Sequence, residues 1–175
     1  MKNLETFSPE QISIVNDSAS VAEEVVNNFY KMSASQWRQR KYDVKTLADL
    51  CHNEIVHGPF AQVIRYEGKR KDRSLSSSIY DFYKICLQDH AILSALKQSP
   101  DIKLFPFALY IITHELVHIV RFCKFLQNFD APPRKKMAEE TRVHKDAHKI
   151  LTTLRVPGLE KVLTRCSNFF DMTLV

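Results

Sequence analysis

The amino-acid sequence predicts a mainly α-helical protein: a single-domain helical bundle over residues 1–175, with at most one or two short strands. Three observations support this fold class. Apolar residues recur at helical spacing in most segments of the chain. Glycine is scarce, with 3 residues, which disfavours a turn-rich β protein. The chain is 45% hydrophobic and 26% charged, which is enough for one well-formed core.

The N-terminal region is expected to form two helices. The first begins at Ser8-Pro9-Glu10-Gln11, with the serine as N-cap, the proline in the first turn and the glutamine completing a capping box. Asn16-Asp17-Ser18 is expected to interrupt this helix. Apolar residues at helical spacing then predict an amphipathic helix over about residues 21–32.

The middle of the chain is expected to hold two helices and the one convincing strand. The first helix runs over about residues 44–57 and is capped by Asp43. Residues 60–67, with the sequence FAQVIRYE, have strand composition, although a single strand has no obvious partner. A long helix is expected over residues 72–98, before Ser99-Pro100.

The C-terminal part is expected to contain a helical hairpin and one further helix. Residues 104–126 and about 131–155 form the two long helices, and Asp130 is a candidate N-cap for the second. The connecting loop of residues 127–130 is so short that the helices should be antiparallel neighbours. Residues 158–175 form a short helix with an apolar tail.

The first helix of the hairpin contains a metal-binding motif. Its sequence, LFPFALYIITHELVHIVRFCKFL, is apolar on nearly every side, which is typical of a buried helix. Buried ionisable groups are costly unless they are paired or bind a metal. His114 and His118 are four residues apart, hence about 40° apart on one helix face, and both can reach one ion. Glu115 can then hold a metal-bound water or accept its proton.

The second helix of the hairpin supplies further ligand-type residues. An antiparallel pairing places Glu140 opposite His118, and His144 opposite His114. Glu140 is the expected third metal ligand, and Glu139, about 100° away, is expected to face solvent. His144 is either a fourth ligand or a residue that orients one. Four protein ligands close a zinc site, whereas three leave a position for water.

Two further residues on the ligand face could assist catalysis. Arg121 could steady Glu140 or polarise a substrate oxygen, or its side chain could simply extend out of the helix end. Tyr110 could donate a hydrogen bond to an oxyanion, or it could pack in the core with its hydroxyl satisfied.

A second E-x-x-H sequence, Glu54 to His57, allows a different metal site. Paired with Glu115 and His118, it could form the two E-x-x-H motifs of a dinuclear iron or manganese carboxylate bundle. That site also needs glutamates from two other helices. Glu140 is one candidate, but no good second candidate is present, and the remaining histidines of the hairpin would have no role.

Charge and composition restrict the remaining classes. The net charge is +5, but the basic residues are scattered, and the one dense run, residues 68–73, is expected to be a solvated loop. A nucleic-acid partner is therefore not expected, and a homodimer is an option that the apolar tail would suit. The longest apolar stretch is broken by His114, Glu115 and His118, so no membrane span is expected.

The expected compartment is the cytoplasm. The N-terminus lacks the long apolar run of a signal peptide. The 4 cysteines are widely spaced without a C-x-x-C, so reduced thiols are expected rather than disulfides or a zinc knuckle.

The sequence H-E-L-V-H followed by a downstream glutamate resembles the zincin metallopeptidases of the glutamate-ligand branch. The resemblance covers residues 114–144. It implies that His114 and His118 are zinc ligands, Glu115 the general base and Glu140 the third ligand. The chain departs from the family pattern at His144, where aspartate is common. Zincins also bind substrate along a sheet edge, for which only the segment FAQVIRYE is available here.

These observations together predict a Zn²⁺-dependent hydrolase that acts on a peptide or another small amide substrate. Two alternatives remain. The first is a non-catalytic, metal-stabilised module in which His144 completes the coordination of the ion. The second is the dinuclear iron or manganese protein described above.

Overall fold

The computed structural model describes residues 3–33, 35–36, 41–69, 79–124 and 129–173. Helix predominates in this part of the chain, which confirms the mainly α class. The three described strands exceed the one or two that the sequence predicts. The elements are α1 (Pro9–Tyr30), β1 (Lys41–Lys45), β2 (Ala61–Lys69), β3 (Ile79–Leu87), α3 (Asp89–Gln98), α4 (Leu104–Cys123), α5 (Pro133–Leu151) and α6 (Leu159–Thr173).

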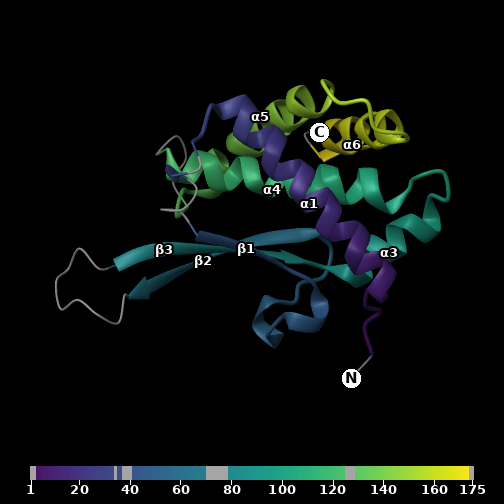
Figure 1. The fold of residues 1–175 in the computed structure, drawn as a ribbon, viewed down its shortest axis with the longest axis horizontal. Coiled ribbons are helices and arrows are strands. Elements are labelled where there is room, and N and C mark those ends of the chain that lie inside the picture. Colours follow the sequence, from purple (N-terminus) through teal and green to yellow (C-terminus); the bar gives the residue numbers. More distant parts are fainter. Residues whose placement is uncertain (1–2, 34, 37–40, 70–78, 125–128, 174–175) are drawn as a thin grey trace.

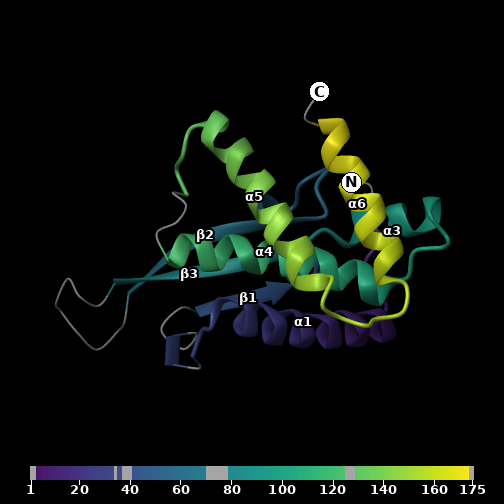
Figure 2. The same cartoon turned by 90° about the horizontal axis from the view of Figure 1, so that it is seen from above.

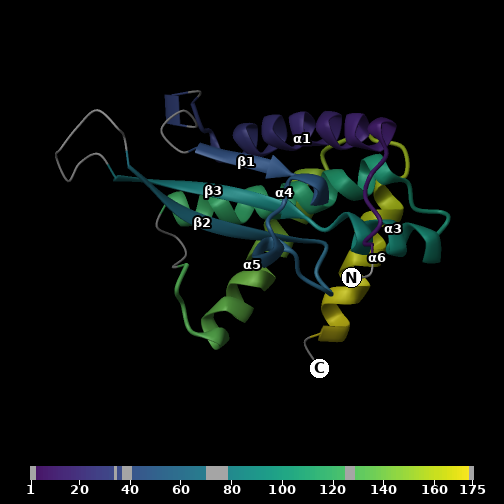
Figure 3. The same ribbon diagram turned by 90° about the horizontal axis from the view of Figure 1, so that it is seen from below.

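The strands form a mixed sheet in the order β1-β3-β2, with β1 parallel and β2 antiparallel to β3. Figure 1 shows α1 and α4 along one face of this sheet, with α5 and α6 beyond α4. The segment between β1 and β2 lies on the opposite face. Seen from below in Figure 3, β2 is the sheet edge nearer to α5, and α1 lies on the side of β1. The helices therefore form layers on a sheet.

Helix α4 is the centre of the core. It contacts α1, α5, α6 and two of the strands, and Leu109, Ile112, Leu116 and Ile119 are completely buried. Burying one such side chain contributes about 1.5–3 kcal/mol. By length and hydropathy α4 could also span a membrane, but 83% of its 18-residue apolar stretch is buried inside the molecule. A core helix of this kind meets the same criteria.

Helix α1 begins as the sequence predicts and then continues without a break. Ser8 Oγ accepts from the Gln11 backbone N–H, and the Gln11 side chain accepts from the Ser8 N–H. The expected interruption at residues 16–18 is wrong, because Ser18 is buried and its hydroxyl donates to the Val15 carbonyl at 2.7 Å. The helix ends at Lys31, whose φ of 54° is left-handed.

The helix predicted over residues 44–57 is also wrong. Residues 41–45 form β1, and two short 3₁₀ turns, Leu47–Asp49 and His52–Glu54, follow. Side chains from distant elements hold this segment in place of helical hydrogen bonds. The Asp89 carboxylate accepts from the Leu47 N–H at 2.9 Å, and the Gln88 side chain bonds the backbone of this segment at two points.

The long helix predicted over residues 72–98 is half correct. Residues 72–78 lie outside the described residues, residues 79–87 form β3, and only residues 89–98 are helical. Apolar side chains occupy both faces of β3 because both faces are covered. Tyr83 and Ile85 alternate with Cys86, and all three are buried. A strand buried on both faces lacks the alternation that would identify it from sequence.

The predicted strand and the two hairpin helices are present, with different ends. Strand β2 covers residues 61–69, close to the expected 60–67. Helix α5 starts after Pro132 as N-cap, not after Asp130. Of the loop predicted at 127–130, residues 127 and 128 lie outside the described residues, and residues 129 and 130 form a turn. Helices α4 and α5 are in contact, and Figure 2 shows them crossing obliquely.

Candidate metal centre

The two motif histidines lie on the face of α4 that meets α5. His118 is 7% exposed, and the side chain of His114 is 13% exposed. Their ring centroids are 5.0 Å apart with planes inclined at 61°. The positions four residues apart on a buried helix therefore place both imidazoles at one point, as the sequence predicts.

Glu140 of α5 meets both histidines. Its Oε2 lies 3.2 Å from Nε2 of His114, and its Oε1 lies 2.9 Å from Nε2 of His118. Burial acts to raise the pKa of the Glu140 carboxyl, but the hydrogen bonds to His114 and His118 and the charges of these histidines together outweigh it, so the pKa is lowered. One residue of α5 thus closes the group that the motif begins.

The geometry of these three residues fits a metal ion. The ligand atoms of His114, His118 and Glu140 lie within 4.8 Å of one another. A tetrahedral Zn²⁺ binds nitrogen and oxygen at roughly 2.0–2.2 Å, which places its ligand atoms about 3.4 Å apart. Two imidazoles and a carboxylate are also a ligand set that catalytic zinc uses.

Glu115 lies beside this group and lines the same pocket as His114 and Glu140. Burial raises the pKa of the Glu115 carboxyl, His114 and His118 act to lower it, and Glu140 raises it. The Glu115 carboxylate therefore lies near the candidate ligands His114, His118 and Glu140 but is not one of them.

His144 and Tyr110 form a pair one helical turn from His114, His118 and Glu140, the candidate metal group. The Tyr110 hydroxyl lies 2.8 Å from Nδ1 of His144, and both residues are buried. His144 is not part of the group whose ligand atoms gather within 4.8 Å. The expected contact of His118 with Glu140 is confirmed at 2.9 Å. Glu140 also bonds His114, and His144 bonds Tyr110, one turn before His114.

Arg121 binds Glu139, not Glu140. Its Nε and Nη2 donate to the two Glu139 carboxylate oxygens at 2.9 and 3.2 Å. Glu139 is 8% exposed, so the expectation that it faces solvent is wrong. The apolar residues Val143 and Ile150 could have predicted this burial, since both are buried on the helix face that also holds Glu139.

The Arg121–Glu139 pair is part of a network that joins three helices. Arg142 donates to Glu139 at 3.0 Å. Arg121 also lies 3.9 Å from the Asp146 carboxylate, which accepts from the Tyr30 hydroxyl of α1 at 2.9 Å. Because Glu139 precedes Glu140 in α5, this network fixes the helix turn that carries the candidate ligand.

A pocket of about 930 Å³ opens beside the metal group. Its wall includes Glu115 and Tyr110 from α4, Glu140 from α5 and residues at the start of β2 and along α3. Sequence reasoning missed the α3 side of this pocket, because those residues were assigned to a helix that should have begun at residue 72. The pocket gives a small molecule or an extended chain access to the candidate centre.

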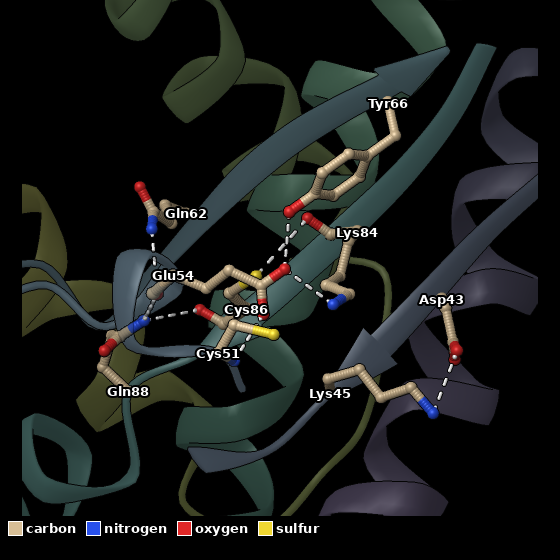
Figure 4. A network of polar contacts seen from close by, with 9 residues as sticks. All are labelled: Asp43, Lys45, Cys51, Glu54, Gln62, Tyr66, Lys84, Cys86 and Gln88. Carbon is tan, nitrogen blue, oxygen red and sulfur yellow. Dashed lines mark hydrogen bonds and ion pairs between the residues drawn. The ribbon is translucent and has the colours of Figure 1, made fainter. Parts of the chain in front are cut away.

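The second E-x-x-H sequence does not form a comparable site. Glu54 lies in a 3₁₀ turn and is 1% exposed. Figure 4 shows its carboxylate between the side chains of Lys84 and Tyr66, which donate at 2.7 and 2.5 Å. The Cys51 N–H donates to the other oxygen at 2.8 Å. Hydrogen bonds from Lys84, Tyr66 and Cys51 lower the pKa of Glu54 to about 2.

The cysteines and the basic run complete the predicted features. The four cysteines are thiols rather than disulfides, as predicted; Cys86 is buried, whereas Cys51 is exposed. Of the basic run, residues 70–73 lie outside the described residues.

Comparison with protein families, curated proteins and solved structures finds no match to this chain.

Proposed function

We propose that this chain is a zincin-type hydrolase that uses Zn²⁺ bound by His114, His118 and Glu140 to cleave a peptide or related amide bond. The observation that supports this most directly is the contact of one α5 carboxylate with both motif histidines. Glu115 and the pocket beside them supply the second requirement of such an enzyme, a base with access to substrate.

Each residue of the site then has a defined part. Zinc bound by the three ligands would supply a water with a pKa near ~7 and a charge that polarises the substrate carbonyl. Glu115 accepts the proton of that water and returns it to the leaving amine. Burial raises the pKa of Tyr110, so its hydroxyl stays protonated and can donate to the developing oxyanion.

The sheet supports the peptide class of substrate. Strand β2 lies at the sheet edge nearer to α5, and its first residue, Ala61, lines the pocket. An extended peptide can add to such an edge by backbone hydrogen bonds, which is the mode that the resemblance to zincins implies. This edge and the metal group border the same pocket.

Glu115→Gln tests the proposal. Loss of the carboxylate should remove peptide hydrolysis while one zinc per chain remains bound, because Glu115 is not a ligand. Peptide-library cleavage and elemental analysis measure the two properties. Retained hydrolysis would contradict the role of Glu115, and loss of zinc would contradict its position outside the ligand set. Lys145→Gln, an exposed change on α5, is the control that should alter neither.

A metal-stabilised module without catalysis is the second candidate, and the buried position of His144 favours it. His144 lies one helical turn beyond Glu140, and it would complete the coordination by exchanging its bond to the Tyr110 hydroxyl for the metal. In that case His144→Ala should lower zinc affinity about as much as His114→Ala. In the hydrolase it should reduce the catalytic rate more than zinc affinity.

The dinuclear alternative lacks the residue on which it depends. It needs Glu54 as a ligand, but Lys84 and Tyr66 already bind that carboxylate. The alternation of side chains places these two residues on the sheet face opposite to Val63 and Ile85, which pack in the core with α4.

A further inference from the structure

The pocket beside the metal group has a second polar point, at His90. This residue lies in the first turn of α3, and its ring is 5.3 Å from that of His57. Both ring nitrogens of His90 are buried and have no hydrogen-bond partner among the described residues. His57 and His90 line the pocket that Glu115 and Glu140 also line.

Unpaired buried nitrogens in a pocket indicate a ligand or ordered water. Buried polar atoms in proteins are almost always hydrogen-bonded, and an exception needs an explanation. His90 lines a pocket of about 930 Å³, which has the volume for such a partner. Neutral imidazole offers one donor and one acceptor, so the best partner is a group that both accepts and donates.

The rest of the lining selects an aromatic body. Phe60 and Phe107 form an edge-to-face pair with centroids 5.0 Å apart on the pocket wall. Ala91 and Ala95 of α3 leave space beside them, and Ile111 adds an apolar surface. Aromatic rings bind well to such a wall because they bury a large area and meet other rings edge to face.

Charge disfavours an acidic ligand at this point. Glu115 and Glu140 line the same pocket, and the Asp89 carboxylate adjoins His90 in sequence. The one arginine of the lining, Arg165, is paired with Asp101 at 3.5 Å. In the metal-free protein an anion would therefore meet two carboxylates, and the lining offers it no unpaired arginine or lysine.

We propose that this part of the pocket binds the phenol side chain of a tyrosine residue in the peptide substrate, with His90 bonding the hydroxyl. The assignment rests on the proposed hydrolase function for its role in catalysis. The binding itself does not, because Phe60, Phe107 and His90 would hold a free phenol in a protein that cleaves nothing. The pocket would thus set the substrate preference of the enzyme.

Binding of p-cresol and toluene tests the recognition separately from catalysis. The two probes differ by one hydroxyl, and their affinities are measured by NMR titration of the whole chain after treatment with a chelator, so that no probe can bind a metal ion in the pocket. The wild type should bind p-cresol about tenfold more tightly than toluene, which is the effect of one net hydrogen bond. His90→Phe and, as a second variant, His90→Leu should remove this preference. His52→Phe, in an exposed histidine outside the pocket lining, is the matched control and should keep it.

Three results would overturn the assignment. These are equal affinity of the wild type for the two probes, a preference that survives in both His90 variants, and tighter binding of the anionic probe p-toluate than of p-cresol. Glu115→Gln should leave the p-cresol preference unchanged, so failure of hydrolysis and failure of the phenol site give different results. If peptides are cleaved without a tyrosine preference that depends on His90, the substrate assignment is wrong.

Discussion

The chain contains E-x-x-H twice, and the two copies have opposite surroundings. Glu115 and His118 lie on a long buried helix. His118 belongs to a group whose ligand atoms lie within 4.8 Å of one another, and Glu115 lies beside that group. Glu54 lies in a 3₁₀ turn, where three donors satisfy its carboxylate. His57 lies beyond that turn, with its ring 5.3 Å from that of His90.

The difference shows that the spacing has chemical meaning only on a continuous helix. On α4 the continuous helix aligns His118 with His114 one turn earlier, and Glu140 reaches both histidines from α5. In the 3₁₀ turn the same four letters leave the glutamate bound to Lys84 and Tyr66, which is a structural role. Substitutions at the two sites should separate a carboxylate that stabilises the fold from one that binds a metal.

The largest expected effect is at Glu54. Glu54→Ala leaves the Lys84 ammonium, 17% exposed, without its partner, and should reduce the free energy of unfolding by about 3–5 kcal/mol. Urea denaturation measures this loss. The double variant Glu54→Gln, Lys84→Met removes both charges and should recover most of it. A loss below about 1 kcal/mol in Glu54→Ala would show that the buried pair is not structural.

Zinc should have the next largest effect on stability. A ligand that binds only the folded chain stabilises it by about 2.7 kcal/mol at a concentration 100 times its Kd. Zinc should therefore raise the melting temperature of chelator-treated wild type, measured by calorimetry. His118→Ala should not respond, whereas Glu54→Gln, Lys84→Met should respond like the wild type. A response that persists in His118→Ala would place the metal elsewhere.

Arg121 should act on the metal without touching it. Arg121→Met removes the bidentate bond to Glu139 and loosens the turn of α5 that carries Glu140. Loss of an interaction that orients a ligand typically costs about 10–100-fold in metal affinity. Competition with a chelator measures this change. Arg142→Met is the control: its side chain is 65% exposed, so the effect should be small.

Acid should distinguish the two sites further. The folded-state pKa of Glu54 is about 2, below its ordinary value of 4.5. A lowered pKa stabilises the fold above the unfolded-state value, and this contribution is lost as pH falls from about 4.5 towards 2. Acid unfolding of the wild type should therefore be steeper over this window than that of Glu54→Gln, Lys84→Met. Equal pH profiles would contradict the lowered pKa.

Local signals were sufficient for the elements with clear ends and helical periodicity. The Ser8 capping box and the apolar run of α4 predict their helices, and the His114 to His118 spacing predicts which residues converge. Glu140 was also identified from sequence as the partner of these histidines. Its neighbour Glu139 was misplaced, because the rotation of α5 depends on which apolar residues meet α4.

The sheet could not be predicted because its stabilising contacts are distant in the sequence. β1 pairs with β3 in parallel, Val44 beside Ile85. β1 alternates polar and apolar residues over only five positions, and β3 shows no such alternation. The turn before β2 depends on Gln88 and Asp89, more than 30 residues later. The pocket is lined by the start of β2 and by α3, and its α3 wall and His90 could therefore not be identified while residues 72–98 were assigned to one long helix.

The most direct test of the metal centre is the zinc content of the protein, purified without chelator or a metal-binding tag and measured by elemental analysis. We predict one zinc per chain in the wild type and in Glu115→Gln, and none in His118→Ala. Absence of metal from a folded wild type, or an unchanged zinc content in His118→Ala, would contradict the centre at His114, His118 and Glu140.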